Sequence, residues 1–148
     1  MSGLLVHVEA EEGIRPAAEP AEVERIVSFV LAAEGVAGAE LSVALVSDAT
    51  ISGINESYLR HEGPTDVVSF PLPGPDERVV GDVYVGAEQA RRQAAELGED
   101  PRIETLRLAA HGTLHVLGFD HPEGEGREDS SMYRRQEELL AAFLAEGR

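Results

Sequence analysis

The chain has 148 residues, of which 43% are hydrophobic and 27% are charged, and this length and balance suit one compact domain over residues 1–148. It contains no cysteine, which excludes disulfides, thiolate metal ligands and a cysteine nucleophile. All 12 basic residues are arginines, and because 28 acidic residues outnumber them the net charge is −16, so a nucleic-acid site requires a local cluster of arginines that overrides the long-range repulsion.

The first third of the chain predicts a strand, a helix and a second strand. Residues 4–8 alternate weakly between apolar and polar side chains, as a strand does. Pro20 begins a helix, and Gly35 ends it. The apolar residues of this helix recur three and four positions apart and form one stripe: Val23, Ile26, Val27, Val30 and Leu31. A period of two over residues 41–46 predicts the second strand.

The middle of the chain predicts one helix and two further strands. Asp48 is placed to cap a helix that runs to about residue 59. The inward face of this helix consists of Ile51, Ile54 and Tyr58. Residues 67–70 and 79–85 are rich in valine and indicate strands, and the turn-forming segment PLPGPDER joins them.

Three helices account for most of the remaining chain. The first covers residues 87–97. The second begins after Asp100, whose carboxylate can accept the free N–H groups of a helix start, and runs to Leu117, where Gly118 ends it. The last covers about residues 130–146. The sequence therefore predicts an α/β (α+β) fold, a single domain in which a small sheet of about four strands packs with about five helices.

The chain shows no sign of a membrane segment. No apolar run approaches the roughly 18 residues that a membrane-spanning helix needs. The N-terminal segment MSGLLVHVEAEEG has no basic stretch before its short apolar run, unlike an export signal. We therefore expect a cytoplasmic protein with no membrane partner.

Three of the five histidines fall in one stretch, HGTLHVLGFDH, at residues 111–121. His111 and His115 are four residues apart on a predicted helix, so their side chains lie on one face, one turn apart. Gly118 allows a sharp turn after the helix, which can bring His121 back toward the same point. Three imidazoles around one ion leave a fourth position for water, as in catalytic zinc sites.

The alternative for these histidines is an ordinary place in the core or on the surface. A single histidine or an i,i+4 pair is a weak pattern for a metal site. The spacing of three histidines around a helix-ending glycine is what favours metal binding here. We expect one ion per chain, and neutral imidazoles suit Zn²⁺, although nickel, copper and iron also accept them.

The histidine spacing also matches the metzincin proteases, H-E-x-x-H-x-x-G-x-x-H. Those enzymes carry a glutamate as general base where this chain has Gly112, which has no side chain to take a proton. Met132 could correspond to their methionine turn, but its place in a predicted amphipathic helix indicates core packing instead. Peptide hydrolysis by the usual route therefore lacks its general base. Hydrolysis of a substrate that does not require this base is still possible, because the metal itself activates the water.

Four segments in chain order form a larger pattern. They are NESYLRHEGPTDVVSFP at residues 55–71, GDV at 81–83, HGTLHVLGFDH at 111–121 and MYRRQEELL at 132–140. This pattern resembles the bacterial endoribonuclease family typified by YbeY. The family's motifs run N-x-x-Y-R-x-x-x-x-P-T-D-V-L-S-F-P, G-D-[IV], H-G-x-L-H-L-x-G-[YF]-D-H and M-x-x-x-Q-E-E-x-L. The chain departs from them by an extra Leu59 before the arginine and by Val116 in place of a leucine.

The resemblance implies a zinc-dependent, single-strand-specific endoribonuclease that acts in maturation of ribosomal RNA, above all of the small subunit, and in ribosome quality control. Its implied partners are single-stranded rRNA and the ribosome or ribosomal proteins. His111, His115 and His121 carry over as the metal ligands, and Arg60 carries over as the arginine of the first motif.

Arg60 is the expected catalytic residue. A permanently charged, planar guanidinium can bind the scissile phosphate and stabilise the extra negative charge of its transition state. Without the motif, an arginine at a helix end is more simply a solvated side chain beside the helix dipole. Asp66 and Ser69 are interpreted first as turn or strand contacts, and the alternative is a contact with a metal ligand or with the substrate. Asp120 either orients an imidazole or only turns the chain.

Three functions remain open on the sequence alone. The first is metal-dependent hydrolysis of RNA, for which the net charge predicts weak and salt-sensitive affinity. Few arginines other than Arg60 could contact RNA; the candidates are Arg91, Arg92, Arg102, Arg107, Arg134 and Arg135. The second is a metalloprotease or another metallohydrolase, and the third is a ribosome-associated module with a structural metal.

Overall fold

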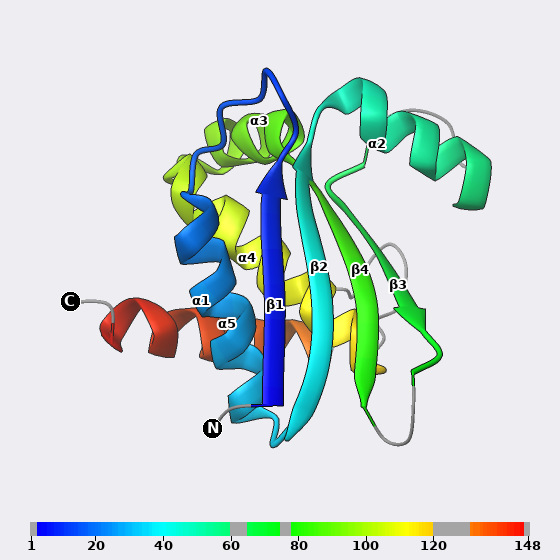
Figure 1. Cartoon of the computed structure of the whole chain (residues 1–148). Coiled ribbons are helices and arrows are strands. Elements are labelled where there is room, and N and C mark those ends of the chain that lie inside the picture. The colour runs from blue at the N-terminus through cyan, green and yellow to red at the C-terminus, as the bar shows by residue number, and fades with distance from the viewer. Residues whose placement is uncertain (1–2, 60–64, 75–77, 120–130, 147–148) are drawn as a thin grey trace.

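The computed structural model describes residues 3–59, 65–74, 78–119 and 131–146 (Figure 1). Its centre is a four-stranded sheet in the order β1-β2-β4-β3. Strands β1 (Gly3–Ala10), β2 (Gly38–Val46) and β4 (Val79–Gly86) are parallel, and β3 (Val67–Leu72) runs antiparallel to β4. The sheet is therefore mixed, with the antiparallel strand at one edge.

Three of the helices form two further layers on one face of this sheet. Helices α1 (Pro20–Ala33) and α4 (Pro101–Val116) pack directly on the strands, and α5 (Ser131–Glu146) packs on α1 and α4 (Figure 1). Helix α3 (Ala87–Leu97) follows β4 and packs against α4. Helix α2 (Asp48–Ile54) continues into a π-helical turn, η1 (Asn55–Leu59), and packs on the opposite face of the sheet. The predicted α/β domain of four strands and five helices is confirmed.

The core between sheet and helices consists of the residues whose periodicity predicted it. The five residues of the α1 stripe are all fully buried, and Leu41, Val43 and Leu45 of β2 point to the same core. Burial of one such side chain contributes about 1.5–3 kcal/mol. Met132 is also fully buried, as its place on an amphipathic helix predicted. No helix among the described residues is long and apolar enough to cross a membrane.

The cap of α2 differs from the prediction. Ser47, and not Asp48, is the cap: its Oγ accepts a hydrogen bond from the Thr50 backbone N–H at 3.2 Å. Asp48 is the first residue of the helix, and its carboxylate pairs with Arg92 at 2.8 Å. The carboxylate of Asp48 therefore binds α3 and does not cap α2. Ile51 is buried and Ile54 half-buried, as expected for the inward face, while the Tyr58 side chain lies outside the described part.

Helix α4 is the central element of the helical layers. Eleven of its 16 residues are buried, on all sides of the helix, as expected for a helix with neighbours all round. It approaches the sheet closely at Gly112, where an added Cβ would lie 2.5 Å from Val83 Cγ1 and 3.1 Å from Val67 Cγ2. A second close approach is at Gly81 of β4, which faces Val116. These two glycines bring the histidine-bearing end of α4 against β4.

Replacement of Gly112 by alanine tests this close approach. We expect Gly112→Ala to lower the free energy of unfolding by about 1–3 kcal/mol in urea denaturation, because the new methyl group overpacks a core that cannot make room for it. The matched control is Gly53→Ala in α2, where no atom outside the adjacent residues and the helix's own backbone lies within 4 Å of the new Cβ. That variant should gain up to about 1 kcal/mol from helix propensity. Equal effects of the two substitutions would contradict the packing argument.

Candidate metal centre

Two histidines lie together near the C-terminal end of α4. The ring centroids of His111 and His115 are 4.8 Å apart, and the rings meet at 79°. His111 is buried, with 8% of its surface exposed, and His115 is half-buried. The i,i+4 spacing thus places both imidazoles on one face of a rigid, buried helix, as the sequence predicted.

The end of α4 turns as the sequence predicted. Gly118 adopts φ 100°, a left-handed conformation that favours glycine. The Gly118 N–H donates to the His115 carbonyl and the Phe119 N–H to the Leu114 carbonyl, both at 3.0 Å. These two bonds form a Schellman motif, which satisfies the last carbonyls of the helix. The chain therefore changes direction within three residues of His115.

His111 has a polar partner on a neighbouring helix. Its Nδ1 lies 2.6 Å from Oε1 of Gln136 in α5, and Gln136 is itself 3% exposed. Metal-binding histidines commonly use one ring nitrogen for the ion and the other for a carbonyl or carboxylate oxygen. Two imidazoles one helical turn apart, one of them held in this way, are a donor set that fits Zn²⁺.

Two predicted site residues, Arg60 and His121, lie outside the described residues, as does Asp120. Within the ranges that the structure describes, no group of three or more potential metal ligands is present. The structure thus brings together two of the three predicted ligands, and the third ligand and the catalytic arginine stay predictions.

Gly112 faces the sheet, where a Cβ would meet Val83, Val67 and Ser69. A Cβ added at this position would lie closest to Val83, and Ser69 Oγ of β3 donates a hydrogen bond to the Gly112 carbonyl at 3.1 Å. A glutamate at this position could not be accommodated, so α4 is not built to carry the metzincin base. Ser69 therefore has a structural contact, and Asp66 caps β3 by accepting from the Val67 N–H at 2.8 Å.

Most of the arginines that could contact RNA are engaged with acidic residues or backbone. Four of them form ion pairs that link helices: Arg92 with Asp48, Arg102 with Glu22, Arg107 with Glu99, Glu104 and Glu137, and Arg135 with Glu34. Arg91 donates to the Arg15 carbonyl at 2.8 Å. The contacts with Glu99 above all raise the pKa of Arg107. These side chains stabilise the fold and leave less positive charge for a polyanion.

Sequence reasoning gave no individual role to Gln136. It lies on the inward face of α5, four residues after Met132 and three before Leu139, both of which are buried. A glutamine at the centre of an otherwise apolar stripe is the signal that could have found it, because a buried amide needs partners. The sequence showed it only as one letter of the last family motif.

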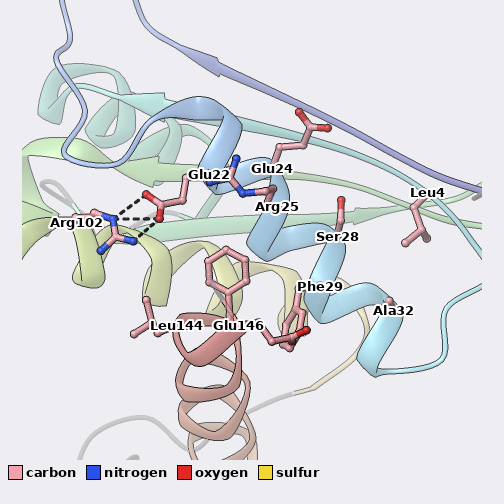
Figure 2. A pocket seen from close by; sticks show the side chains of 11 residues that line it. Leu4, Glu22, Glu24, Arg25, Ser28, Phe29, Ala32, Arg102, Leu144 and Glu146 are labelled. Atoms are coloured by element: carbon pink, nitrogen blue, oxygen red, sulfur yellow. Dashed lines mark hydrogen bonds and ion pairs between the residues drawn. The ribbon is translucent and has the colours of Figure 1, made fainter. Parts of the chain in front are cut away.

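A groove of about 670 Å³ lies elsewhere on the molecule, between α1 and the end of α5 (Figure 2). Phe29 and Phe143 meet edge to face in it, with ring centroids 5.7 Å apart. The ion pair of Arg102 with Glu22 lies at one end. Arg102 precedes His111 by nine residues, roughly 13 Å along the helix. The groove is therefore separate from the histidine pair.

The fold is shared with a solved structure. A Thermotoga maritima protein whose structure was determined in solution superimposes with a TM-score of 0.66 at 25% sequence identity. The match covers 97% of this chain and 92% of the other. The whole domain, and not only the helix that carries the histidines, therefore has a known counterpart.

Sequence comparison identifies the family. The family model described as endoribonuclease YbeY matches residues 7–144. A protein of that name from Bacillus licheniformis is 38% identical over 152 aligned positions, which cover 95% of each chain. Another from Moorella thermoacetica is 43% identical over 131 positions, covering 80% of this chain and 83% of the relative. Because the similarity extends over nearly the whole chain, the protein belongs to the YbeY endoribonuclease family.

Proposed function

We propose that the protein is a zinc-dependent endoribonuclease specific for single strands, which acts in the cytoplasm in maturation of small-subunit ribosomal RNA and in ribosome quality control. The observation that carries this proposal is the His111–His115 pair within a motif of the family, in which His111 also contacts Gln136. Relatives from Bacillus licheniformis and Moorella thermoacetica bear the name endoribonuclease YbeY. Single-stranded rRNA is then the substrate, and the ribosome or its proteins are the partners.

His111, His115 and His121 would hold one Zn²⁺ in this proposal. The chemistry that a zinc ion supplies when bound is polarisation of a phosphoryl oxygen and activation of water at neutral pH. Helix α4 contributes rigidity, since two of the ligands project from a segment that is buried on all sides. Arg60 would bind the scissile phosphate and stabilise its charge through two parallel hydrogen bonds.

A metalloprotease with the same three histidines is the second candidate, favoured by the spacing of the ligands. It is opposed by the packing of Gly112, since the position of the protease's general base faces Val83 with no room for a side chain. A ribosome-associated module with a structural metal is the third candidate. It is opposed by the ligand count, because three protein ligands leave one position open.

The high negative charge bears on how RNA is bound. With a net charge of −16 and four of the candidate arginines paired with carboxylates, long-range attraction to RNA is absent. Ribosomal proteins, which would supply positive charge near the substrate, offset this repulsion in the proposed setting. Affinity for isolated RNA is then weak and falls with added salt.

The experiment that tests the function offers three substrates to the purified protein. We expect cleavage of a single-stranded RNA, no cleavage of an RNA duplex and no cleavage of casein. A chelator should abolish the cleavage, and added Zn²⁺ should restore it. RNA cleavage that persists after the metal is removed would contradict the zinc mechanism, and cleavage of casein would favour the protease.

Metal analysis of single variants tests the ligand set. The wild type should hold about one transition-metal ion per chain, and His111→Ala, His115→Ala and His121→Ala should each lose most of it. His7→Ala is the matched control, because His7 is exposed on β1 and pairs only with the neighbouring Glu9 in the contacts of the described residues. Full occupancy in any of the three variants would remove that histidine from the set.

Substitution of Arg60 tests the role of its guanidinium. Arg60→Lys keeps the charge but cannot make the planar two-point contact with a phosphate, so we expect a loss of about 10²-fold or more in the cleavage rate. Metal content and melting temperature should stay unchanged. Arg25→Lys, at an exposed arginine of α1, is the control and should cleave normally. Normal cleavage by Arg60→Ala would contradict the assignment, and unfolding of the variants would indicate a structural role instead.

A further inference from the structure

The side chain of Gln136 connects a histidine of the candidate metal centre to an ion-pair cluster. Its Oε1 lies 2.6 Å from His111 Nδ1, and its Nε2 lies 2.9 Å from Glu137 Oε2. Glu137 in turn accepts from Arg107 Nε at 2.8 Å and from Arg107 Nη2 at 3.2 Å. The order of contacts is therefore His111, Gln136, Glu137 and Arg107.

The cluster determines which way the amide of Gln136 points. Arg107 is a donor only, so the carboxylate of Glu137 that it contacts is an acceptor. The group of Gln136 that faces this carboxylate must then be the NH₂ donor. A flipped amide would place two oxygens against each other at 2.9 Å. Oε1 is consequently the atom that faces His111.

The amide direction determines where the imidazole proton of His111 lies. A carbonyl oxygen can only accept, so Nδ1 of His111 must carry the proton that it donates to Gln136 Oε1. A neutral imidazole protonated on Nδ1 holds its lone pair on Nε2. Nε2 is therefore the ring nitrogen that can coordinate an ion, and this holds already in the metal-free protein.

Arg107 fixes the position of Glu137, the residue that orients the Gln136 amide. Its guanidinium also contacts Glu99 at 2.6 Å and the buried Glu104 at 2.5 Å. Glu104 accepts a further bond from Gln93 Nε2 of α3 at 2.7 Å. Glu137 therefore binds a guanidinium that two other carboxylates hold, and it cannot turn away from Gln136 without giving up an ion pair.

We propose that Gln136 is a positioning residue that sets the tautomer and ring orientation of His111 for metal binding through Nε2. This inference rests on the proposed role of His111 as a ligand. An apolar side chain would suit the stripe of Met132 and Leu139 better, because a buried amide gains nothing from burial and needs both of its partners. Outer partners of this kind commonly contribute ten- to a hundredfold to metal affinity.

The decisive experiment uses Gln136→Met, which keeps the length of the side chain and removes both hydrogen bonds. ¹⁵N NMR of the metal-free wild type should show His111 as the Nδ1-protonated tautomer, and in Gln136→Met this tautomer should no longer dominate. Competition of the protein with a chelator for Zn²⁺ should show a ten- to hundredfold weaker affinity in the variant. A purely structural role for Gln136 would change the melting temperature without changing the tautomer.

A second pair of variants keeps the inference testable if Gln136→Met does not fold. Glu137→Gln replaces one acceptor oxygen of the carboxylate with an NH₂ donor, so residue 137 no longer requires the Gln136 amide to point in one direction. We therefore expect a mixture of His111 tautomers and weaker Zn²⁺ binding. Glu138→Gln is the matched control on the exposed side of α5, where the residue contacts only Arg135 at 3.6 Å among the described residues. It should leave both measurements unchanged.

Two results would overturn the inference. One is an Nε2-protonated His111 in the metal-free wild type, and the other is unchanged Zn²⁺ affinity in both Gln136→Met and Glu137→Gln. A wild type that binds no Zn²⁺ would overturn the metal site itself and this inference with it. The two failures are distinguishable, because the tautomer is measured in the absence of metal.

Discussion

The close packing of α4 against the sheet is the constraint on which the rest of the structure depends. Each face of a helix that is buried on all sides must pack against another element. Helix α4 packs against the sheet on one side and against α1, α3 and α5 on the others. Gly112 and Gly81 set how near the helix and β4 come. Because interiors are as dense as organic crystals, this distance also determines where the imidazoles at the helix end can lie.

Ion pairs then hold the outer helices to this centre. Arg107 of α4 binds three carboxylates, and of these Glu137 links α4 to α5. The charge of the buried Glu104 is compensated in the same cluster. Removing one partner of a buried pair destabilises a protein by about 3–5 kcal/mol, because the other charge is left without compensation. The more exposed pair of Arg92 with Asp48 contributes little by the same measure. Stability is thus concentrated where α4 and α5 meet, beside His111.

Local signals made much of the fold predictable. Helix starts and ends follow from single residues, as at Pro20 for α1 and at Gly98, whose φ of 66° ends α3. The histidine pair was equally predictable, since two residues with i,i+4 spacing on a helix always lie on the same face, one turn apart. Contacts between distant segments were not. The cap of α2 shifted to Ser47 because Arg92 and Glu88, some 40 positions away, engage Asp48. The direction of the Gln136 amide likewise depends on Arg107, which no local pattern links to it.

The position of the histidines at the C-terminal end of α4 has an electrostatic consequence for the kind of ligand that suits this end of the molecule. Aligned peptide dipoles place partial negative charge at a helix C-terminus, which favours cations within the last turn. The excess of carboxylates over arginines adds a field of the same sign around it. This negative potential attracts a divalent cation toward the imidazoles. A cation bound there would make the local potential positive, and a phosphate would then be attracted to a site that otherwise repels it.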